Sequence, residues 1–257
     1  MAGWVDTHCH LFLMAEDTAT VIDRAAKEGV SWLMCPGIDL ETTLQARTIA
    51  MEHPGRVRWS AGLHPHHASQ WEEQRGRLGS LALEADAIGE CGLDYYRDLS
   101  PRDQQRTAFA GHVALAAELD KPIIIHVRDA FADAYDELES AGLGARAVMH
   151  CWTGGPRWTK RFTDLGVTFS FAGAITYDTA DAVRRGAAEA PPHRTIVETD
   201  SPYLTPVPHR GEENRPEWVA LNGEALAEVW GIDVDEVAEL TAGHAGRVFG
   251  SASADDG

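Results

Sequence analysis

Short apolar runs alternate with longer amphipathic stretches along almost all of this 257-residue chain, and this alternation constrains the fold most strongly. Eight runs rich in β-forming residues are predicted as strands, at 4–9, 30–35, 57–63, 87–93, 122–127, 145–151, 167–171 and 195–199. Helical stretches separate them, for example 18–28, 40–52, 101–119, 130–140 and 178–190, and two more close the chain at 216–230 and 234–249. Eight strands that each precede a helix predict an α/β fold, the (β/α)8 TIM barrel.

The barrel is predicted to be a single domain that covers residues 1–250. Residues 251–257 are small, polar and acidic, and we expect them to form a disordered tail. A doubly wound sheet is the main alternative architecture. It is disfavoured because no Gly-x-Gly-x-x-Gly fingerprint follows the first predicted strand.

Composition indicates a soluble protein, with 44% hydrophobic and 24% charged residues. No apolar run approaches the ~20 residues that a membrane span needs, and no basic segment with an apolar core begins the chain. We therefore expect a cytoplasmic protein without a membrane partner. The net charge of −18 disfavours non-specific binding of nucleic acid through the general surface. An anionic substrate must then be held by bound metal or by a few arginines.

The four cysteines lack the close spacing of a metal or redox motif. Cys9, Cys91 and Cys151 directly follow candidate ligands, and neighbours on a strand point to opposite faces. We expect these three cysteines to be small buried residues between sheet and helices, as free cysteines often are.

Polar residues gather where the predicted strands end, which is the face where barrel enzymes build their active sites. The first strand leads into two histidines at i and i+2, a spacing that puts both on one strand face. The candidate metal ligands at these ends are His8, His10, Glu90, His126, His150 and Asp200. A single histidine there is more often a hydrogen-bonded packing residue, and a single carboxylate can cap a helix. Six such groups facing one mouth are costly to bury unless metal or hydrogen bonds satisfy them.

Six ligands exceed the three or four that one catalytic zinc ion takes, so two divalent ions are predicted. We assign one ion to His8, His10, Glu90 and Asp200 and the other to Glu90, His126 and His150, with Glu90 as the bridge. Histidine and carboxylate ligands accept Zn²⁺, Mn²⁺, Mg²⁺ or Co²⁺, so the metal stays open.

Six motifs in order resemble the TatD family of metal-dependent deoxyribonucleases, which are amidohydrolase-type barrels. They are Asp6-Thr7-His8-Cys9-His10-Leu11, Gly62-Leu63-His64-Pro65, Gly89-Glu90-Cys91-Gly92-Leu93-Asp94-Tyr95, His126-Val127-Arg128, His150-Cys151-Trp152-Thr153-Gly154 and Glu198-Thr199-Asp200-Ser201-Pro202-Tyr203-Leu204. The resemblance implies a (β/α)8 barrel, two divalent metals and hydrolysis of phosphodiester bonds, often from a 3′ end. DNA or another phosphodiester is then the substrate, and no obligate protein partner is evident.

Roles for the remaining residues are stated as hypotheses. Asp200 orients the attacking water or accepts its proton, and His64 donates a hydrogen bond to phosphate or protonates the leaving group. Arg128, two residues beyond His126, holds a phosphate through two hydrogen bonds. Glu198 contacts a histidine ligand. Tyr95, Tyr96, Trp152 and Tyr203 stack on bases of a frayed strand end. The alternatives are rim packing for His64, an ion pair with Asp129 or Asp94 for Arg128, and core packing for the aromatic residues.

Two departures from the family pattern bear on substrate choice. Trp152 replaces a usual Phe, and Asn214-Arg215-Pro216 replaces a usual Asn-Glu-Pro. An ester or amide hydrolase, such as a deacylase or lactonase, is the alternative function on the same site. Many such barrels bridge their metals with a carboxylated lysine, but none of Lys27, Lys121 and Lys160 ends a predicted strand. A non-enzymatic relative is disfavoured because all six ligand positions are intact.

Overall fold

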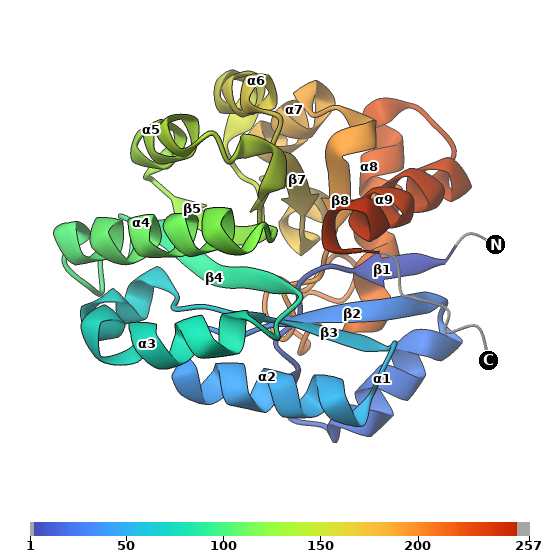
Figure 1. Ribbon diagram of the computed structural model, residues 1–257. Coiled ribbons are helices and arrows are strands. Elements are labelled where there is room, and N and C mark those ends of the chain that lie inside the picture. The colour runs from blue at the N-terminus through green and yellow to red at the C-terminus, as the bar shows by residue number, and fades with distance from the viewer. Residues whose placement is uncertain (1–2, 251–257) are drawn as a thin grey trace.

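The computed structural model describes residues 3–250, and in them eight parallel strands form a barrel surrounded by helices (Figure 1). Each strand pairs in parallel with its neighbour in sequence, in the order β1 to β8. The strands are β1 (Trp4–Asp6), β2 (Val30–Pro36), β3 (Val57–Ala61), β4 (Ala87–Asp94), β5 (Ile123–Arg128), β6 (Ala147–Met149), β7 (Thr168–Phe171) and β8 (Thr195–Val197). The predicted TIM barrel is confirmed.

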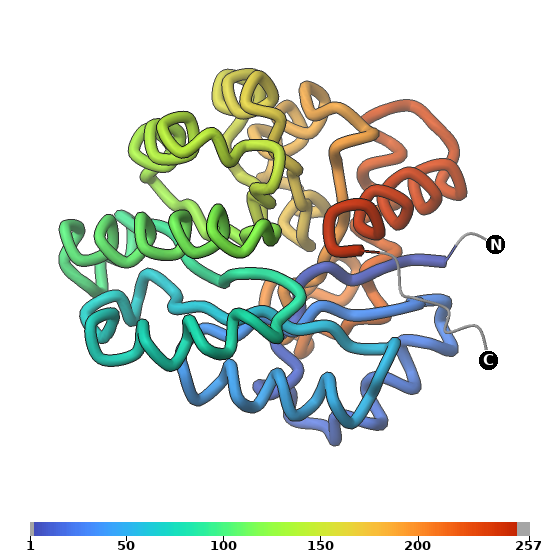
Figure 2. The backbone as a smooth tube through the Cα atoms, in the orientation of Figure 1, coloured from blue at the N-terminus to red at the C-terminus, as the bar shows by residue number. Residues whose placement is uncertain are grey.

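The first and last strands close the barrel through the loops that follow them. Thr7 N donates to Val197 O over 3.1 Å, and an isolated parallel bridge joins Cys9 to Ser201. Figure 2 shows the orange and red end of the chain returning beside the blue first strand. The two segments that carry His8 and Asp200 are therefore neighbours in space.

Nine α-helices of the described chain surround the barrel. They are α1 (Thr18–Lys27), α2 (Leu40–Glu52), α3 (Trp71–Ala82), α4 (Arg102–Leu119), α5 (Phe131–Ala141), α6 (Gly155–Leu165), α7 (Asp181–Glu189), α8 (Val219–Trp230) and α9 (Val234–Phe249). Helices α3 and α6 add to the stretches predicted above. Helix α9 covers the amino ends of the strands, where its Ala245 and Phe249 pack on Val5, Trp32 and Ile196 of the barrel interior.

Three strands are shorter than predicted because the backbone turns before the ligands are reached. The first strand stops at Asp6, so His8 and His10 lie on the following loop and strand alternation does not place them. Cys151 and Asp200 follow β6 and β8 with φ of +46° and +58°, in the left-handed region. The positions of His8, His10, His150 and Asp200 therefore depend on loop geometry, which the apolar runs do not specify.

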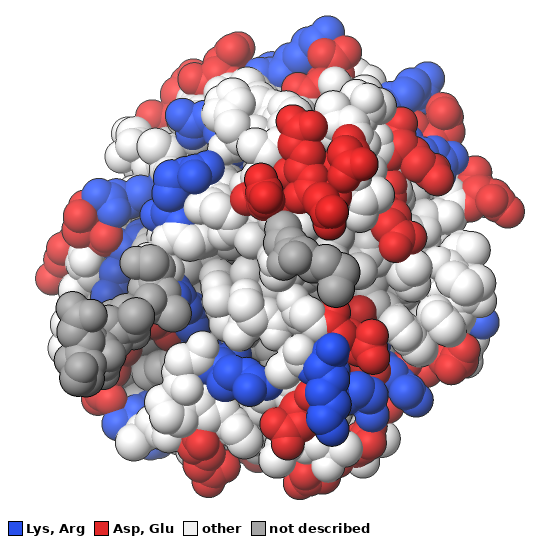
Figure 3. All heavy atoms as spheres, turned by 90° about the vertical axis from the view of Figure 1, so that its right-hand side faces the viewer, with Lys and Arg blue, Asp and Glu red and all other residues white. Residues whose placement is uncertain are grey.

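Cys9 and Cys91 are buried in the apolar layer between strands and helices, as expected, and Cys35 is buried there too. The prediction is wrong for Cys151, which is partly exposed and lines the cavity described below. Figure 3 shows basic and acidic side chains interspersed on one side of the molecule, with a group of acidic ones above its centre. None of the helices in residues 3–250 is long and apolar enough to cross a membrane. The predicted acidic tail lies outside the described residues.

Candidate metal centre

A cavity of about 860 Å³ opens at the carboxyl ends of the strands. Five of the six predicted ligands line it, namely His10, Glu90, His126, His150 and Asp200. The sixth, His8, is fully buried and stacks on His150 with ring centroids 3.6 Å apart. The structure thus brings all six residues together on the face where barrel active sites lie.

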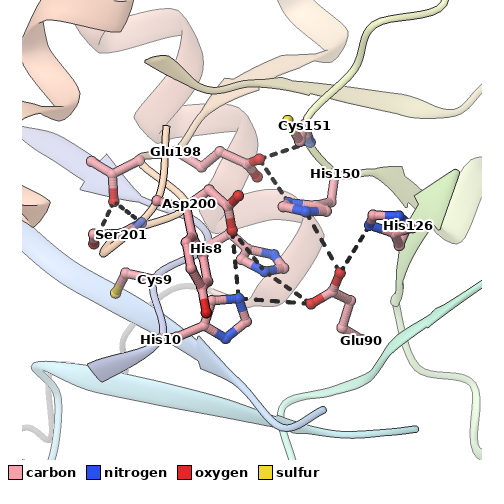
Figure 4. Close-up of polar contacts among 12 residues, drawn as sticks. His8, Cys9, His10, Glu90, His126, His150, Cys151, Glu198, Asp200 and Ser201 are labelled. Atoms are coloured by element: carbon pink, nitrogen blue, oxygen red, sulfur yellow. Dashed lines mark hydrogen bonds and ion pairs between the residues drawn. The ribbon is translucent and has the colours of Figure 1, made fainter. Parts of the chain in front are cut away.

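Glu90 lies at the centre of this cluster, and each of its two carboxylate oxygens faces a different group (Figure 4). Glu90 Oε2 is 3.3 Å from His8 Nε2 and 3.8 Å from His10 Nε2. Asp200 Oδ1 completes this group, 3.8 Å from His8 Nε2 and 3.5 Å from His10 Nε2.

The second group faces the other oxygen of the same carboxylate. Glu90 Oε1 is 3.3 Å from His126 Nδ1 and 3.6 Å from His150 Nε2. Two ligands bound about 2.05 Å from a tetrahedral ion lie roughly 3.3 Å apart, which matches these separations. A carboxylate with one oxygen in each group has the arrangement of a bridging ligand.

Glycines on β4 let Glu90 reach this central position. Gly89 and Gly92 have φ of +120° and +133°, which other residues rarely adopt. A Cβ at Gly89 would lie 2.5 Å from Ile124 O, and one at Gly92 would lie 2.0 Å from His126 O. Only glycine therefore allows β4 to approach β5 this closely.

Buried hydrogen bonds hold the loop that carries Asp200. Asp200 N donates to His8 O over 2.8 Å, and the buried Asn214 side chain donates to Thr199 O. Asp6 accepts from Thr199 N at 2.8 Å and from Thr199 Oγ1 at 2.6 Å. Burial raises the pKa of Asp6 to about 8, although these hydrogen bonds oppose the rise. Asp6 thus joins the ends of β1 and β8 rather than reaching the cavity.

Contacts with carboxylates fix which ring nitrogen of two histidines is free to bind metal. His126 Nε2 is 3.2 Å from Asp94 Oδ2, and His150 Nδ1 is 2.7 Å from Glu198 Oε1. An ionised carboxylate only accepts, so each of these nitrogens carries the proton. In the neutral rings the lone pairs of His126 Nδ1 and His150 Nε2 face Glu90, and a metal cation would replace the second proton there.

His64 has the opposite arrangement. The backbone N–H of His66 donates to His64 Nδ1 over 3.2 Å, so the proton of the neutral ring is on Nε2. That nitrogen faces Glu90 Oε1 at 3.4 Å. Burial holds the pKa of His64 well below its usual range, so the ring is neutral near pH 7. In this tautomer His64 presents a hydrogen-bond donor to the cavity.

Unpaired polar atoms test whether these residues fit a metal. Among the residues described, buried His8 has no hydrogen-bond partner at either ring nitrogen, and His10 has none at Nδ1. An unsatisfied buried nitrogen is costly, and coordination by His8 Nε2 would remove that cost at one position. The donor set of imidazole nitrogens and carboxylate oxygens suits a divalent cation.

The potential in the cluster is negative. Burial alone would raise the pKa of Glu90, but the histidines around it hold that pKa well below its usual range. Burial opposes a charge on His150 as well, yet the charges of Glu198 and Glu90 raise its pKa to about 10. A site that attracts a proton this strongly also attracts a metal cation.

Tyr95 and Trp152, two of the predicted base-stacking residues, do not line the cavity. Trp152 is 3% exposed, packs between aromatic rings and donates from Nε1 to Thr159 Oγ1 over 2.8 Å. The Tyr95 hydroxyl donates to Asp133 over 2.6 Å, away from the mouth. Among the Phe, Tyr and Trp side chains, Phe131 and Tyr203 line the cavity, and Tyr203 is 54% exposed.

Arg128 lines the cavity, as predicted. Its guanidinium lies over the Tyr96 ring, 4.0 Å from the centroid, and stays exposed at the mouth. Arg97 is a further cavity-lining arginine that the sequence reasoning did not include.

Asp94 is the residue that sequence reasoning missed most clearly. Its Oδ2 contacts His66 Nε2 at 2.9 Å as well as His126 Nε2, so one carboxylate holds two histidines. Its position four residues after Glu90, an even spacing on the same strand, was the available signal. Glu198 does contact a histidine, as the hypothesis required.

Comparison with known proteins identifies the family. The family model described as TatD related DNase matches residues 5–250. The chain belongs to the TatD-related DNase family. This membership confirms the resemblance carried by the six motifs and the predicted class of enzyme, a metal-dependent hydrolase.

Individual members of the TatD family are similar to this chain over most of its length. The metal-dependent hydrolase YcfH of Escherichia coli K12 is 36% identical over 253 residues, 95% of each chain. The 3'-5' ssDNA/RNA exonuclease TatD of Yersinia pseudotuberculosis is 36% identical over 197 residues, 75% of this chain and 76% of that one. The crystal structure of the TatD homologue YjjV from Escherichia coli superposes with a TM-score of 0.86 at 27% identity and covers 96% of this chain and 97% of that one.

The two departures from the TatD pattern leave the ligand cluster intact. Trp152 lies in the core, and the Arg215 guanidinium lies 5.3 Å from the Trp218 ring centroid. Neither side chain lines the cavity at the metal cluster.

Proposed function

We propose that this protein is a two-metal exonuclease that hydrolyses phosphodiester bonds of single-stranded DNA from the 3′ end. The observation that carries the proposal is that the two carboxylate oxygens of Glu90 face different groups of residues. Oε2 faces His8, His10 and Asp200, and Oε1 faces His126 and His150. Relatives named 3'-5' ssDNA/RNA exonucleases support the substrate and the direction of digestion.

The two groups of residues would each hold one divalent ion, of Zn²⁺, Mn²⁺, Mg²⁺ or Co²⁺. Bound there, such ions supply Lewis acidity and a water that ionises near neutral pH. Asp200 contributes an acceptor. Burial would raise its pKa, but a hydrogen bond from His10 and the nearby histidines lower it. An ionised Asp200 can orient the water or take its proton.

Side chains of the cavity would hold the phosphate and the terminal base of the substrate. His64 presents Nε2–H to a phosphate or leaving-group oxygen in the cavity. Arg128 offers the paired N–H groups that match two phosphate oxygens, and its position over Tyr96 limits the freedom lost on binding. Tyr203 at the rim provides a ring face for the terminal base.

The test uses single-stranded DNA labelled at either end, bis-p-nitrophenyl phosphate and a p-nitrophenyl ester, with metal added back to chelated enzyme. We expect metal-dependent loss of nucleotides from the 3′ end and no ester cleavage above the chelated control. Faster cleavage of the ester with intact DNA would instead support a deacylase or lactonase. Glu90→Ala should lose activity and bound metal together, whereas Glu189→Ala, at an exposed position paired with Lys160, should lose neither.

A further inference from the structure

A second cavity, of about 530 Å³, lies at the opposite end of the barrel from the metal cluster. Pro122 directly precedes β5, Arg146 precedes β6 and Arg194 precedes β8, and the amino ends of parallel strands share one face. Helix α9 forms the rest of the wall. The lining residues are Pro122, Ala145, Arg146, His193, Arg194, His244, Arg247 and Val248.

This cavity is basic although the chain carries a net charge of −18. Three arginines and two histidines line it, and no carboxylate does. Arg146 pairs with Asp120 outside the lining, and Arg194 donates to Gly166 O, so both guanidinium groups are held in place. Arg247 is exposed and forms no ion pair within residues 3–250, so its charge is open to a ligand.

A buried histidine reports the positive potential of the cavity. His244 is 8% exposed, and its Nε2 is 2.8 Å from Thr168 Oγ1. Burial lowers its pKa to about 4, and the charges of Arg247, Arg194 and His193 lower it in the same direction. The basic groups therefore act on one shared volume rather than pointing apart into solvent.

We propose that this cavity binds a small phosphorylated molecule of nucleotide size. Arg247 and Arg194 provide the N–H groups that suit phosphate oxygens. Pro122, Ala145 and Val248 provide apolar contacts for the organic part. The volume lies in the range of small-molecule pockets, about 300–1,000 Å³. A long polyanion is disfavoured because the net charge of −18 on the chain would repel it.

Calorimetry of the metal-loaded full chain with adenosine monophosphate tests the proposal. Two binding events are expected, because the metal centre also attracts phosphate. Arg247→Gln should weaken one event about tenfold or more and leave cleavage of bis-p-nitrophenyl phosphate unchanged, while Arg247→Lys should keep part of that binding. Arg185→Gln is the matched control, because Arg185 is an exposed arginine that pairs with Asp181 on α7. It should retain both events.

Two results would overturn the proposal. One is an Arg247→Gln protein that binds adenosine monophosphate as the wild type does. The other is adenosine binding as tightly as its monophosphate, because the phosphate would then contribute nothing. If the metal centre were inactive or empty, the event that depends on Arg247 would remain, so this test is independent of the proposed nuclease activity.

Discussion

Replacing Glu198 should weaken metal binding although Glu198 lies behind the proposed ligands. Its Oε1 is 2.7 Å from His150 Nδ1 and also accepts from Cys151 N over 2.7 Å. A hydrogen bond to a charged group contributes about 1.5–3 kcal/mol, and a neutral one about 0.5–1.5 kcal/mol. Glu198→Gln keeps an acceptor oxygen but loses the charge, which costs about 1.4 kcal/mol, or tenfold in metal affinity. Glu198→Ala removes the acceptor as well, and about a hundredfold loss is expected.

Competition of the metal-loaded protein with a chromophoric chelator measures this affinity directly. Glu189→Gln serves as the control, because Glu189 is exposed at the end of α7 and should bind metal like the wild type. Thermal unfolding of the metal-free variants separates a loss of affinity from a loss of fold. Wild-type affinity in both Glu198 variants would refute the claim that this carboxylate orients His150.

Three further predictions follow from the same geometry. Arg128→Ala should raise KM for DNA about tenfold with little change in kcat in steady-state kinetics. Tyr96→Ala should raise KM by a smaller factor, because it removes only the ring over which the Arg128 guanidinium lies. Asp94→Asn should lower metal affinity in the chelator assay, since its carboxylate holds His126. Burial lowers the pKa of His112 to about 4 from 6.5, so the free energy of unfolding should fall by up to about 3 kcal/mol as pH drops through that window. His112→Gln should show a correspondingly smaller fall in urea titrations at pH 7 and pH 4.

The barrel and its six clustered residues could be predicted from sequence because both follow from local patterns. Apolar runs alternate with helices, and five of the predicted strand ends carry the candidate His, Glu and Asp ligands. The places where strands stop could not be read this way. Val197 ends β8 because the chain then turns through Asp200 at φ +58°, and hydrogen bonds to distant residues hold that turn. An apolar run does not encode such contacts.

The direction in which side chains point was the other feature that the sequence could not predict. Trp152 looked suited to base stacking, but Thr159 on α6 accepts its N–H and Gly154 leaves room for its ring. Both contacts depend on how the loop folds back on the helix. The distinction between His64 as donor and His126 as ligand likewise depends on His66 N and Asp94, whose positions only the folded chain provides.

The central claim is that Glu90 bridges two ions. Anomalous diffraction from crystals of the Mn²⁺- or Zn²⁺-loaded protein tests it most directly. The predicted result is two peaks, one beside Oε2 among His8, His10 and Asp200 and one beside Oε1 next to His126 and His150. A single peak at full metal loading, or two peaks of which only one contacts Glu90, would contradict the account.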